Sequence, residues 1–174
     1  VTDFQALADI AHAHGIPLVI DAQNRLSFTV DRSTYSGGGL TLATCGADCT
    51  NLANWTAGKI RSGGTRTALA VQGTTLHQIV DNETTLPATS LAYRTCASNC
   101  TQEASWQELP NFVAYDGARG LAIAVTAQGG IRIAYNQGTA AAGESAAVKM
   151  QDKKLLFWAC DANCLQLANW SGVI

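Results

Sequence analysis

The pattern Cys-x-x-x-Cys, followed six residues later by Trp, occurs three times in this chain and constrains its fold more than any other feature. The copies run from Cys45 to Trp55, from Cys96 to Trp106 and from Cys160 to Trp170. Together they contain all six cysteines and three of the four tryptophans. A pattern of this complexity, found three times in 174 residues, indicates an internal structural repeat.

The spacing of the cysteines predicts local disulfides. The expected pairs are Cys45–Cys49, Cys96–Cys100 and Cys160–Cys164. Disulfides persist in oxidising surroundings, which predicts a secreted or periplasmic protein. Zinc is an alternative, but structural zinc sites favour Cys-x-x-Cys pairs combined with a second pair or with histidines. Free buried thiols are a third possibility.

Composition narrows the range of partners. The net charge is -2 and the sequence has no basic stripe, which argues against nucleic acid as a partner. No apolar run approaches the roughly 20 residues that span a bilayer, so we expect no membrane partner. The chain starts at Val1 without the charged and apolar segments of a signal peptide, as a mature or trimmed product would.

Each repeat contains four short apolar runs. Two runs joined by a Gly- or Asn-containing turn come first, a third enters the first cysteine, and a fourth follows the tryptophan. The runs are rich in Val, Ile, Leu, Thr and aromatic residues, and several alternate with polar residues, which is typical of strands. We therefore predict an all-β fold of three four-stranded antiparallel, propeller-like blades, at about residues 17–60, 61–112 and 113–174. Each cysteine pair is expected in the hairpin between strands three and four, with the tryptophan covering it.

The first 16 residues differ from the repeats. Thr2 is suited to an N-cap, with Gln5 at the capping-box position. An apolar stripe at helical spacing follows, and Gly15 provides a C-terminal stop. This segment therefore predicts an N-terminal α-helix, as a separate unit at residues 1–16.

Two resemblances to known families are visible. The motif formed by the strand Val19–Gln23, the cysteine pairs and the tryptophans resembles tandem repeats of secreted bacterial, myxobacterial-type proteins, which implies β-propeller blades without implying an activity. Residues 4–21 resemble a helix-strand unit of fold-type I pyridoxal-phosphate enzymes, which implies that Asp21 meets the cofactor's pyridine nitrogen. No Schiff-base lysine is identifiable, so the cofactor prediction is none, with a divalent metal as the alternative.

Candidate metal ligands are few. His12 and His14 form the only close histidine pair. Two histidines two positions apart share a face on a strand but diverge on a helix, which makes the pair an alternative rather than a predicted metal site.

Three other residues are candidates for catalysis. Asp31 and Asp81 end the second strand of their repeats, where equivalent positions of a radial assembly share one rim. The same acids also suit turn capping. His77 stands where the other repeats have Ser27 and Arg132, so this position varies as a functional surface would.

Three blades do not close a propeller, which typically has 4 to 8. We therefore expect a homo-oligomer, a dimer completing a six-bladed ring, or further blades in a longer chain. The predicted function is an extracellular binding module for carbohydrate or protein. The alternative is a metal-dependent hydrolase with its site near the propeller axis, and the sequence does not decide whether the chain is an enzyme.

Overall fold

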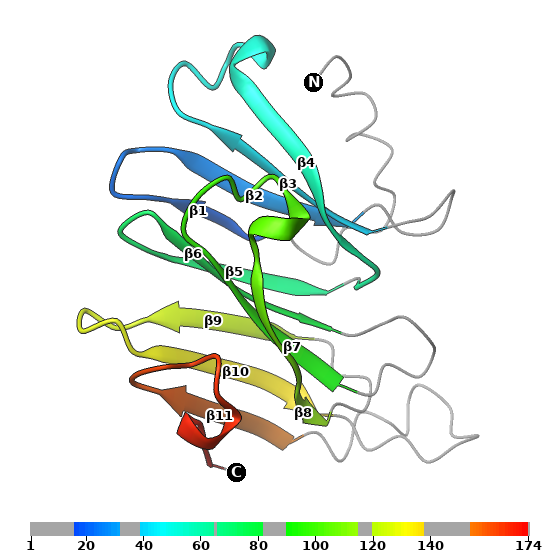
Figure 1. The fold of residues 1–174 in the computed structure, drawn as a ribbon, viewed down its shortest axis with the longest axis vertical. Coiled ribbons are helices and arrows are strands. Elements are labelled where there is room, and N and C mark those ends of the chain that lie inside the picture. The colour runs from blue at the N-terminus through cyan, green and yellow to red at the C-terminus, as the bar shows by residue number, and fades with distance from the viewer. Residues whose placement is uncertain are drawn as a thin grey trace.

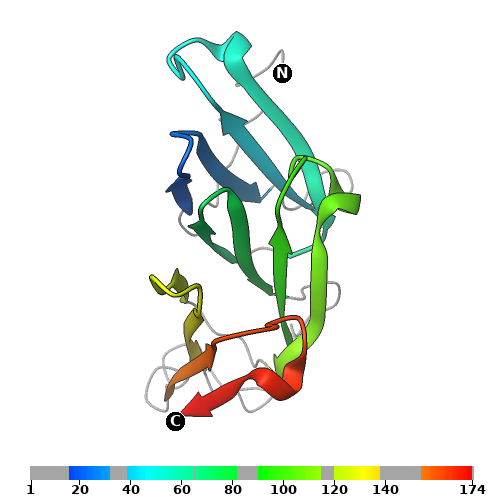
Figure 2. The ribbon, with the colours of Figure 1, turned by 60° about the vertical axis from the view of Figure 1, so that its left-hand side comes forward.

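The computed structural model describes residues 16–31, 39–64, 66–81, 90–114, 120–137 and 154–173. These residues form three four-stranded sheets, stacked one after another along the long axis of the molecule (Figures 1 and 2). Within the described residues, helix is limited to short 3-10 turns, so the all-β prediction is confirmed. The N-terminal helix predicted at residues 1–16 lies, apart from Ile16, outside the described residues, as do His12 and His14.

Each sheet is an antiparallel meander whose strands are neighbours in sequence order. The first sheet contains β1 (Leu18–Ile20), β2 (Leu26–Asp31), β3 (Gly39–Cys45) and β4 (Trp55–Ser62). The middle sheet contains β5 (Thr67–Gln72), β6 (Thr75–Asp81), β7 (Ser90–Cys96) and β8 (Gln107–Ala114). The last sheet contains β9 (Leu121–Val125), β10 (Ile131–Gln137), β11 (Lys154–Cys160) and β12 (Ser171–Val173). The prediction of three four-stranded units is therefore confirmed.

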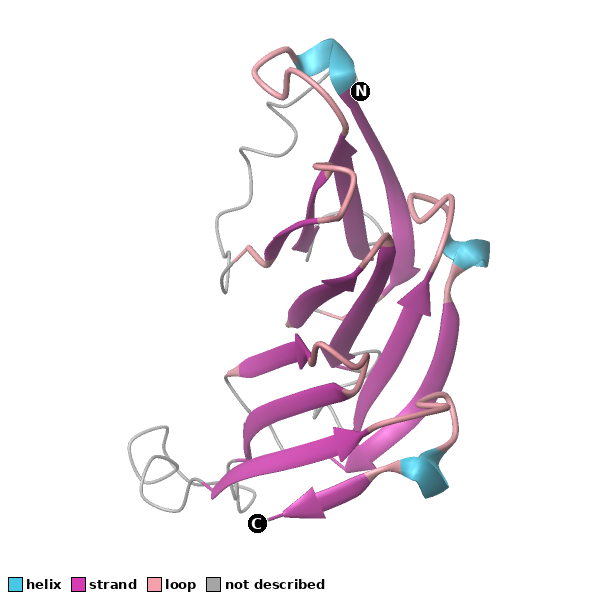
Figure 3. Ribbon diagram, turned by 90° about the vertical axis from the view of Figure 1, so that its left-hand side faces the viewer, coloured by secondary structure: helices cyan, strands magenta, loops and turns pink. Residues whose placement is uncertain are grey.

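The repeated cysteine motif forms one compact hairpin in each sheet. All three predicted disulfides are present: Cys45–Cys49, Cys96–Cys100 and Cys160–Cys164. In each hairpin the residue before the second cysteine has a positive φ, which is why that position holds Asp48, Asn99 or Asn163. A 3-10 turn follows, named η1 (Leu52–Asn54), η2 (Glu103–Ser105) or η4 (Leu167–Asn169). Figure 3 shows these turns (cyan) along one side of the stack.

The tryptophan of each motif holds its hairpin closed. Its indole Nε1 donates to the carbonyl oxygen of the second cysteine of the motif. The N···O distance is 3.0 Å for Trp55 and 2.8 Å for both Trp106 and Trp170. All three rings are buried. The tryptophans are therefore structural, as expected for an indole covering a disulfide.

The inner hairpins close with the predicted turn residues. Asn24, Gly73 and Gly129 adopt positive φ values of 58°, 58° and 88°. These turns also contact one another between sheets, because the amide of Ala22 donates to the carbonyl of Gly73 at 2.9 Å. A Cβ on Gly129 would lie 2.4 Å from the amide nitrogen of the exposed Gln72 side chain, which can move aside, so the positive φ is what favours glycine there.

Two layers of side chains join the three sheets. The first interface, between the first and middle sheets, is centred on Leu40, Leu42, Ile60, Leu76 and Val80. The second interface, between the middle and last sheets, is centred on Tyr93, Phe112, Ile131, Ile133 and Trp170. The first strands of successive sheets lie against each other, β1 against β5 and β5 against β9. No helix among the described residues is long and apolar enough to cross a membrane.

Candidate functional site

The second interface contains a cavity of about 420 Å³. Strands β6 and β7 of the middle sheet provide one wall, and the start of β10 with the disulfide hairpin of the last sheet provides the other. Its lining residues are His77, Tyr93, Thr95, Gly129, Ile131, Asp161, Ala162, Asn163, Cys164, Leu165 and Gln166. A cavity of this size falls within the range of small-molecule sites.

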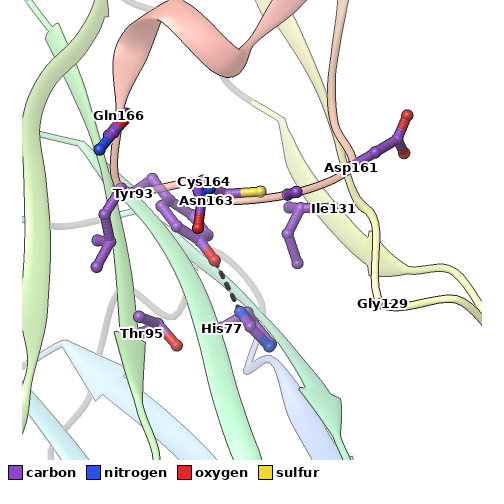
Figure 4. Close-up of a pocket in the computed structure, with 11 residues that line it drawn as sticks. His77, Tyr93, Thr95, Gly129, Ile131, Asp161, Asn163, Cys164 and Gln166 are labelled. Carbon is purple, nitrogen blue, oxygen red and sulfur yellow. Dashed lines mark hydrogen bonds between the residues drawn. The ribbon is translucent and has the colours of Figure 1, made fainter.

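His77 and Tyr93 form the base of this cavity. The two side chains point toward each other beneath the hairpin that carries Asn163 and Cys164 (Figure 4). Nδ1 of His77 and the hydroxyl oxygen of Tyr93 are 2.8 Å apart. The rings are nearly parallel, with centroids 6.2 Å apart. Neighbouring antiparallel strands place these residues side by side, because His77 lies opposite Thr95 and Tyr93 opposite Ile79 in the β6–β7 pairing.

Burial keeps both groups uncharged. It lowers the pKa of His77 below the ordinary value of 6.5, so the imidazole is neutral at pH 7. It raises the pKa of Tyr93 to about 12, so the phenol keeps its proton. A neutral imidazole has one donor and one acceptor nitrogen, and the phenol can satisfy either one.

The second ring nitrogen of His77 has no hydrogen-bond partner in the part of the chain that the structure describes. His77 is only 7% exposed, and its Nε2 is buried without a contact to any polar atom of the described residues. An unsatisfied buried polar atom costs about 1–3 kcal/mol, so a hydroxyl or water that reached it would be favoured. A hydroxyl group fits either tautomer of His77, because it both donates and accepts.

The rest of the lining combines apolar side chains, among them Ile131 and Leu165, with polar ones and carries little charge. Thr95, Asn163 and Gln166 provide hydroxyl and amide groups, and Asp161 is the one acid among the lining residues, which include no lysine or arginine. The Asp161 carboxylate points away from His77 (Figure 4) and is 2.7 Å from Nη2 of Arg132. The cavity is therefore suited to a neutral ligand with several hydroxyl groups.

The acidic candidates do not join His77. Asp81 ends β6 four residues beyond His77, and it is fully buried. Its Oδ1 accepts the amide N–H of Arg66 at 3.0 Å, and its Oδ2 lies 3.8 Å from Nη1 of the same residue. Asp81 thus organises the connection between the first and middle sheets. This is a structural role, but it differs from the predicted capping of the turn that follows Asp81, because the partner is Arg66. Asp31 ends β2, and its side chain is outside the described structure.

Asp21 also has a local structural role. Its Oδ1 accepts the amides of Gln23 and Arg25 at 2.8 and 2.9 Å, and its Oδ2 accepts Nε of Arg25 at 2.7 Å. Burial opposes ionisation of Asp21, but these donors outweigh it and lower the pKa of the carboxyl. Asp21 therefore shapes the β1–β2 turn, and nothing in its surroundings supports the resemblance to pyridoxal-phosphate enzymes.

The hydrolase alternative gains no support from the described residues. No group of three or more His, Cys, Asp or Glu side chains gathers there as a candidate metal site. His77, which the sequence singled out, does line the cavity. The sequence analysis missed the other lining residues, Tyr93, Thr95 and the hairpin residues at 161–166. The residue at the position of Tyr93 also varies among the repeats, since the first repeat has Leu42 there, and this variation could have identified it.

A second polar cluster occupies the first interface. The Arg94 guanidinium donates to the carbonyl of Ile60 at 2.8 Å and to Oε1 of Gln78 at 3.3 Å, and it lies 4.9 Å from the Trp106 ring centroid. Glu108 bridges Arg94 and Arg61, at 3.0 and 3.2 Å. Burial lowers the pKa of Arg94 to about 10, opposed by the Glu108 carboxylate, and the group stays charged at pH 7. Protein groups surround this cluster on both sheets, which indicates a structural role.

Comparison with known proteins defines the class of fold. The chain is similar to the structure of a fucose lectin from Kordia zhangzhouensis in complex with methyl-fucoside, with a TM-score of 0.52. The match covers 91% of this chain and 97% of the lectin at 12% sequence identity, so it shows a shared fold. No protein-family model matches the chain, and no curated protein matches it.

Proposed function

We propose that this protein is an extracellular carbohydrate-binding module of the β-propeller type, with a sugar site in the cavity of the second interface. The observation that carries the proposal is that cavity: its lining combines neutral hydrogen-bonding side chains with apolar ones, and it includes a buried histidine with one nitrogen that has no partner among the described residues. The lectin with a similar fold makes carbohydrate the first ligand class to test.

The chemistry of the lining favours sugars over charged ligands. Sugar hydroxyls both donate and accept hydrogen bonds, which matches the mixed donors and acceptors of Thr95, Asn163 and Gln166. An anionic ligand would find no cationic side chain among the lining residues.

The propeller arrangement and the location are parts of the same proposal. Stacked four-stranded meanders with their first strands side by side are what successive propeller blades present. Three disulfides fit a secreted or periplasmic protein, because such bonds persist in oxidising compartments.

Titration calorimetry against neutral sugars tests the proposal. Methyl-fucoside is the first probe, followed by a glycan array to find other ligands. We expect saturable binding by the natural sequence. The variant His77→Leu should bind about tenfold or more weakly, because it removes both ring nitrogens at similar volume.

The matched control is Tyr135→Phe, a change at an equally buried tyrosine of the same interface that does not line the cavity. Its affinity should equal that of the natural sequence. Absence of binding to every glycan would refute the proposed function. Sugar binding that survives His77→Leu unchanged would place the site elsewhere.

A further inference from the structure

The outer face of the last sheet exposes residues that the other sheets bury. Counted from the first cysteine of each motif, Leu155 and Phe157 correspond to Leu91 and Tyr93 in the middle sheet. Leu155 is 66% exposed and Phe157 is 40% exposed, whereas both middle-sheet residues are buried against the last sheet. The corresponding residues of the first sheet, Leu40 and Leu42, are likewise buried, against the middle sheet.

The outer face of the first sheet has the complementary property. Its side chains surround Trp55 and the Cys45–Cys49 disulfide. Phe28, on this face, packs edge-on against Trp55 and is only partly buried. The residues at the position of Phe28 in the other sheets, Gln78 and Ile133, are fully buried by the sheet that precedes them.

Among the described residues, one face of each kind is therefore covered by no other sheet. These uncovered faces are the outer face of the last sheet, which is exposed, and that of the first sheet, where Phe28 is half-buried and Ala43, Cys45 and Trp55 are buried. Within the chain, a face of the Leu91–Tyr93 kind is always covered by a face of the Phe28 kind from the next repeat. Another copy of this chain carries the matching face of each kind. An exposed apolar surface of this kind is typical of protein interfaces.

We propose that two copies associate head to tail, with the last sheet of each packed on the first sheet of the other. The number of copies follows from the blade count, because six is the only multiple of three between the 4 and 8 blades typical of propellers. A two-fold arrangement leaves neither face uncovered and forms no open chain. The inference rests on the blade arrangement proposed above and is independent of carbohydrate recognition.

The two new interfaces would also contain sites that one chain cannot form alone. Arg132 and Phe157 stand at the positions that His77 and Tyr93 occupy in the second interface. The opposite wall there is the disulfide hairpin at 161–166, and its counterpart in this interface is the hairpin at 46–51 of the second copy. The sites of the ring thus differ in composition, because the residue at the position of His77 is serine in the first repeat and arginine in the last.

Sedimentation equilibrium of the chain at micromolar concentration tests the association. We expect a species of twice the 18.2 kDa chain mass. The double variant Leu155→Asp, Phe157→Asp should weaken self-association by about 100-fold or more, because two carboxylates would be buried in an apolar layer. The matched control is Leu167→Asp, which changes an equally exposed leucine in η4, away from both uncovered faces.

A change on the first sheet distinguishes head-to-tail pairing from packing of two last sheets on each other. Leu26→Asp, on the face of Phe28, should also produce monomers. Thermal unfolding shows whether the Leu26→Asp variant is folded. If it is not, Phe28→Gln is used instead, because the middle sheet has glutamine at the same position. A monomeric natural chain, a larger open-ended assembly, or a dimer unaffected by the first-sheet variant would each overturn the proposal. Sugar binding by a stable monomer would leave the proposed function intact.

Discussion

The two interfaces of the middle sheet are built on the same repeat but from different chemistry. In the first interface the middle sheet presents Arg94 and Gln78, and Arg94 donates both to Gln78 and to the carbonyl of Ile60 in the first sheet. At the same two positions the last sheet presents Trp158 and Ile133 to the second interface. Gly172, opposite Trp158, leaves room for the indole, since a Cβ there would lie 2.9 Å from the ring.

The partner side of each interface differs as well. The first sheet contributes Ser27, whose hydroxyl donates to Thr44 at 3.1 Å. The middle sheet contributes His77 at the same position, where it bonds to Tyr93 and has one nitrogen without a hydrogen bond to the described residues. The backbone repeat thus fixes where side chains meet, while the residues at the meeting points decide whether an interface holds a charged network or a cavity lined mostly by neutral side chains.

The largest change in the free energy of unfolding is expected when the buried ring of Phe112 is removed from the second interface. Phe112 is buried and packs edge-on against Trp158 and Trp170, with centroids 5.4 and 4.4 Å away. Phe112→Ala should lower the free energy of unfolding by about 3–5 kcal/mol, because it leaves a cavity. Urea denaturation measures this loss, with Leu167→Ala, an exposed position, as the control. A loss below about 1 kcal/mol would show that the second interface is not held by its aromatic residues.

A smaller loss of unfolding free energy is expected when the charge of Arg94 is removed from the first interface. Arg94→Met keeps an apolar stem beside Trp106 but leaves the Gln78 side chain and the Ile60 carbonyl without their donor. We expect a loss of about 2–3 kcal/mol, measured in the same way. Arg132→Met is the control, because its partner Asp161 has an 80% exposed side chain and such pairs contribute at most about 1 kcal/mol. Equal effects of the two changes would contradict a special role for the buried network.

Removing the phenol oxygen of Tyr93 tests the base of the cavity. Tyr93→Phe preserves the edge-on packing with Trp170 and deletes the partner of His77 Nδ1. The expected loss is about 1 kcal/mol in unfolding free energy, together with weaker sugar binding. Crystals of the variant soaked with methyl-fucoside would show whether the His77 ring keeps its position. Stability and affinity both equal to those of the natural chain would remove this pair from the site.

The smallest effect is a dependence of stability on pH. Because burial lowers the pKa of His77 below 6.5, protonation favours the unfolded chain. The stability that the folded chain gains from keeping His77 neutral is fully present above pH 6.5. It is lost as the pH falls from 6.5 toward the pKa of His77 in the folded chain. Tyr93 stays neutral across this range, and Asp161 is turned away and paired with Arg132. The difference in stability between the natural chain and His77→Gln should therefore change below pH 6.5, and a constant difference would contradict a buried neutral imidazole.

Much of the fold was accessible from local pattern. The disulfide hairpins, the positive-φ residues Asn24, Gly73 and Gly129, and the four strands of each repeat follow from residues close together in the chain. Their interactions are short-range, so the sequence order carries the information directly. The same reasoning predicted a structural role for the tryptophans, which donate to a carbonyl only six residues away.

The candidate site was accessible only in part. His77 was identified because its position varies among the repeats, but Tyr93 and the hairpin at 161–166 were not. These residues come from two sheets, and only the stacking of those sheets brings them together. The acids Asp21 and Asp81 show the opposite case, because both resemble catalytic groups but accept backbone amides. Asp21 binds its own turn, and Asp81 binds Arg66, 15 residues earlier.

The sequence by itself determined the count and the internal design of the sheets, because the Cys-x-x-x-Cys…Trp motif is closed by contacts within each repeat. Only the tertiary structure decided which faces meet, which polar groups are satisfied across an interface, and which remain available. Those outcomes depend on side chains separated by tens of residues, such as Arg94 with Ile60 and Phe112 with Trp170. Such pairings leave no periodic signal in the chain, since they depend on how one sheet packs against the next.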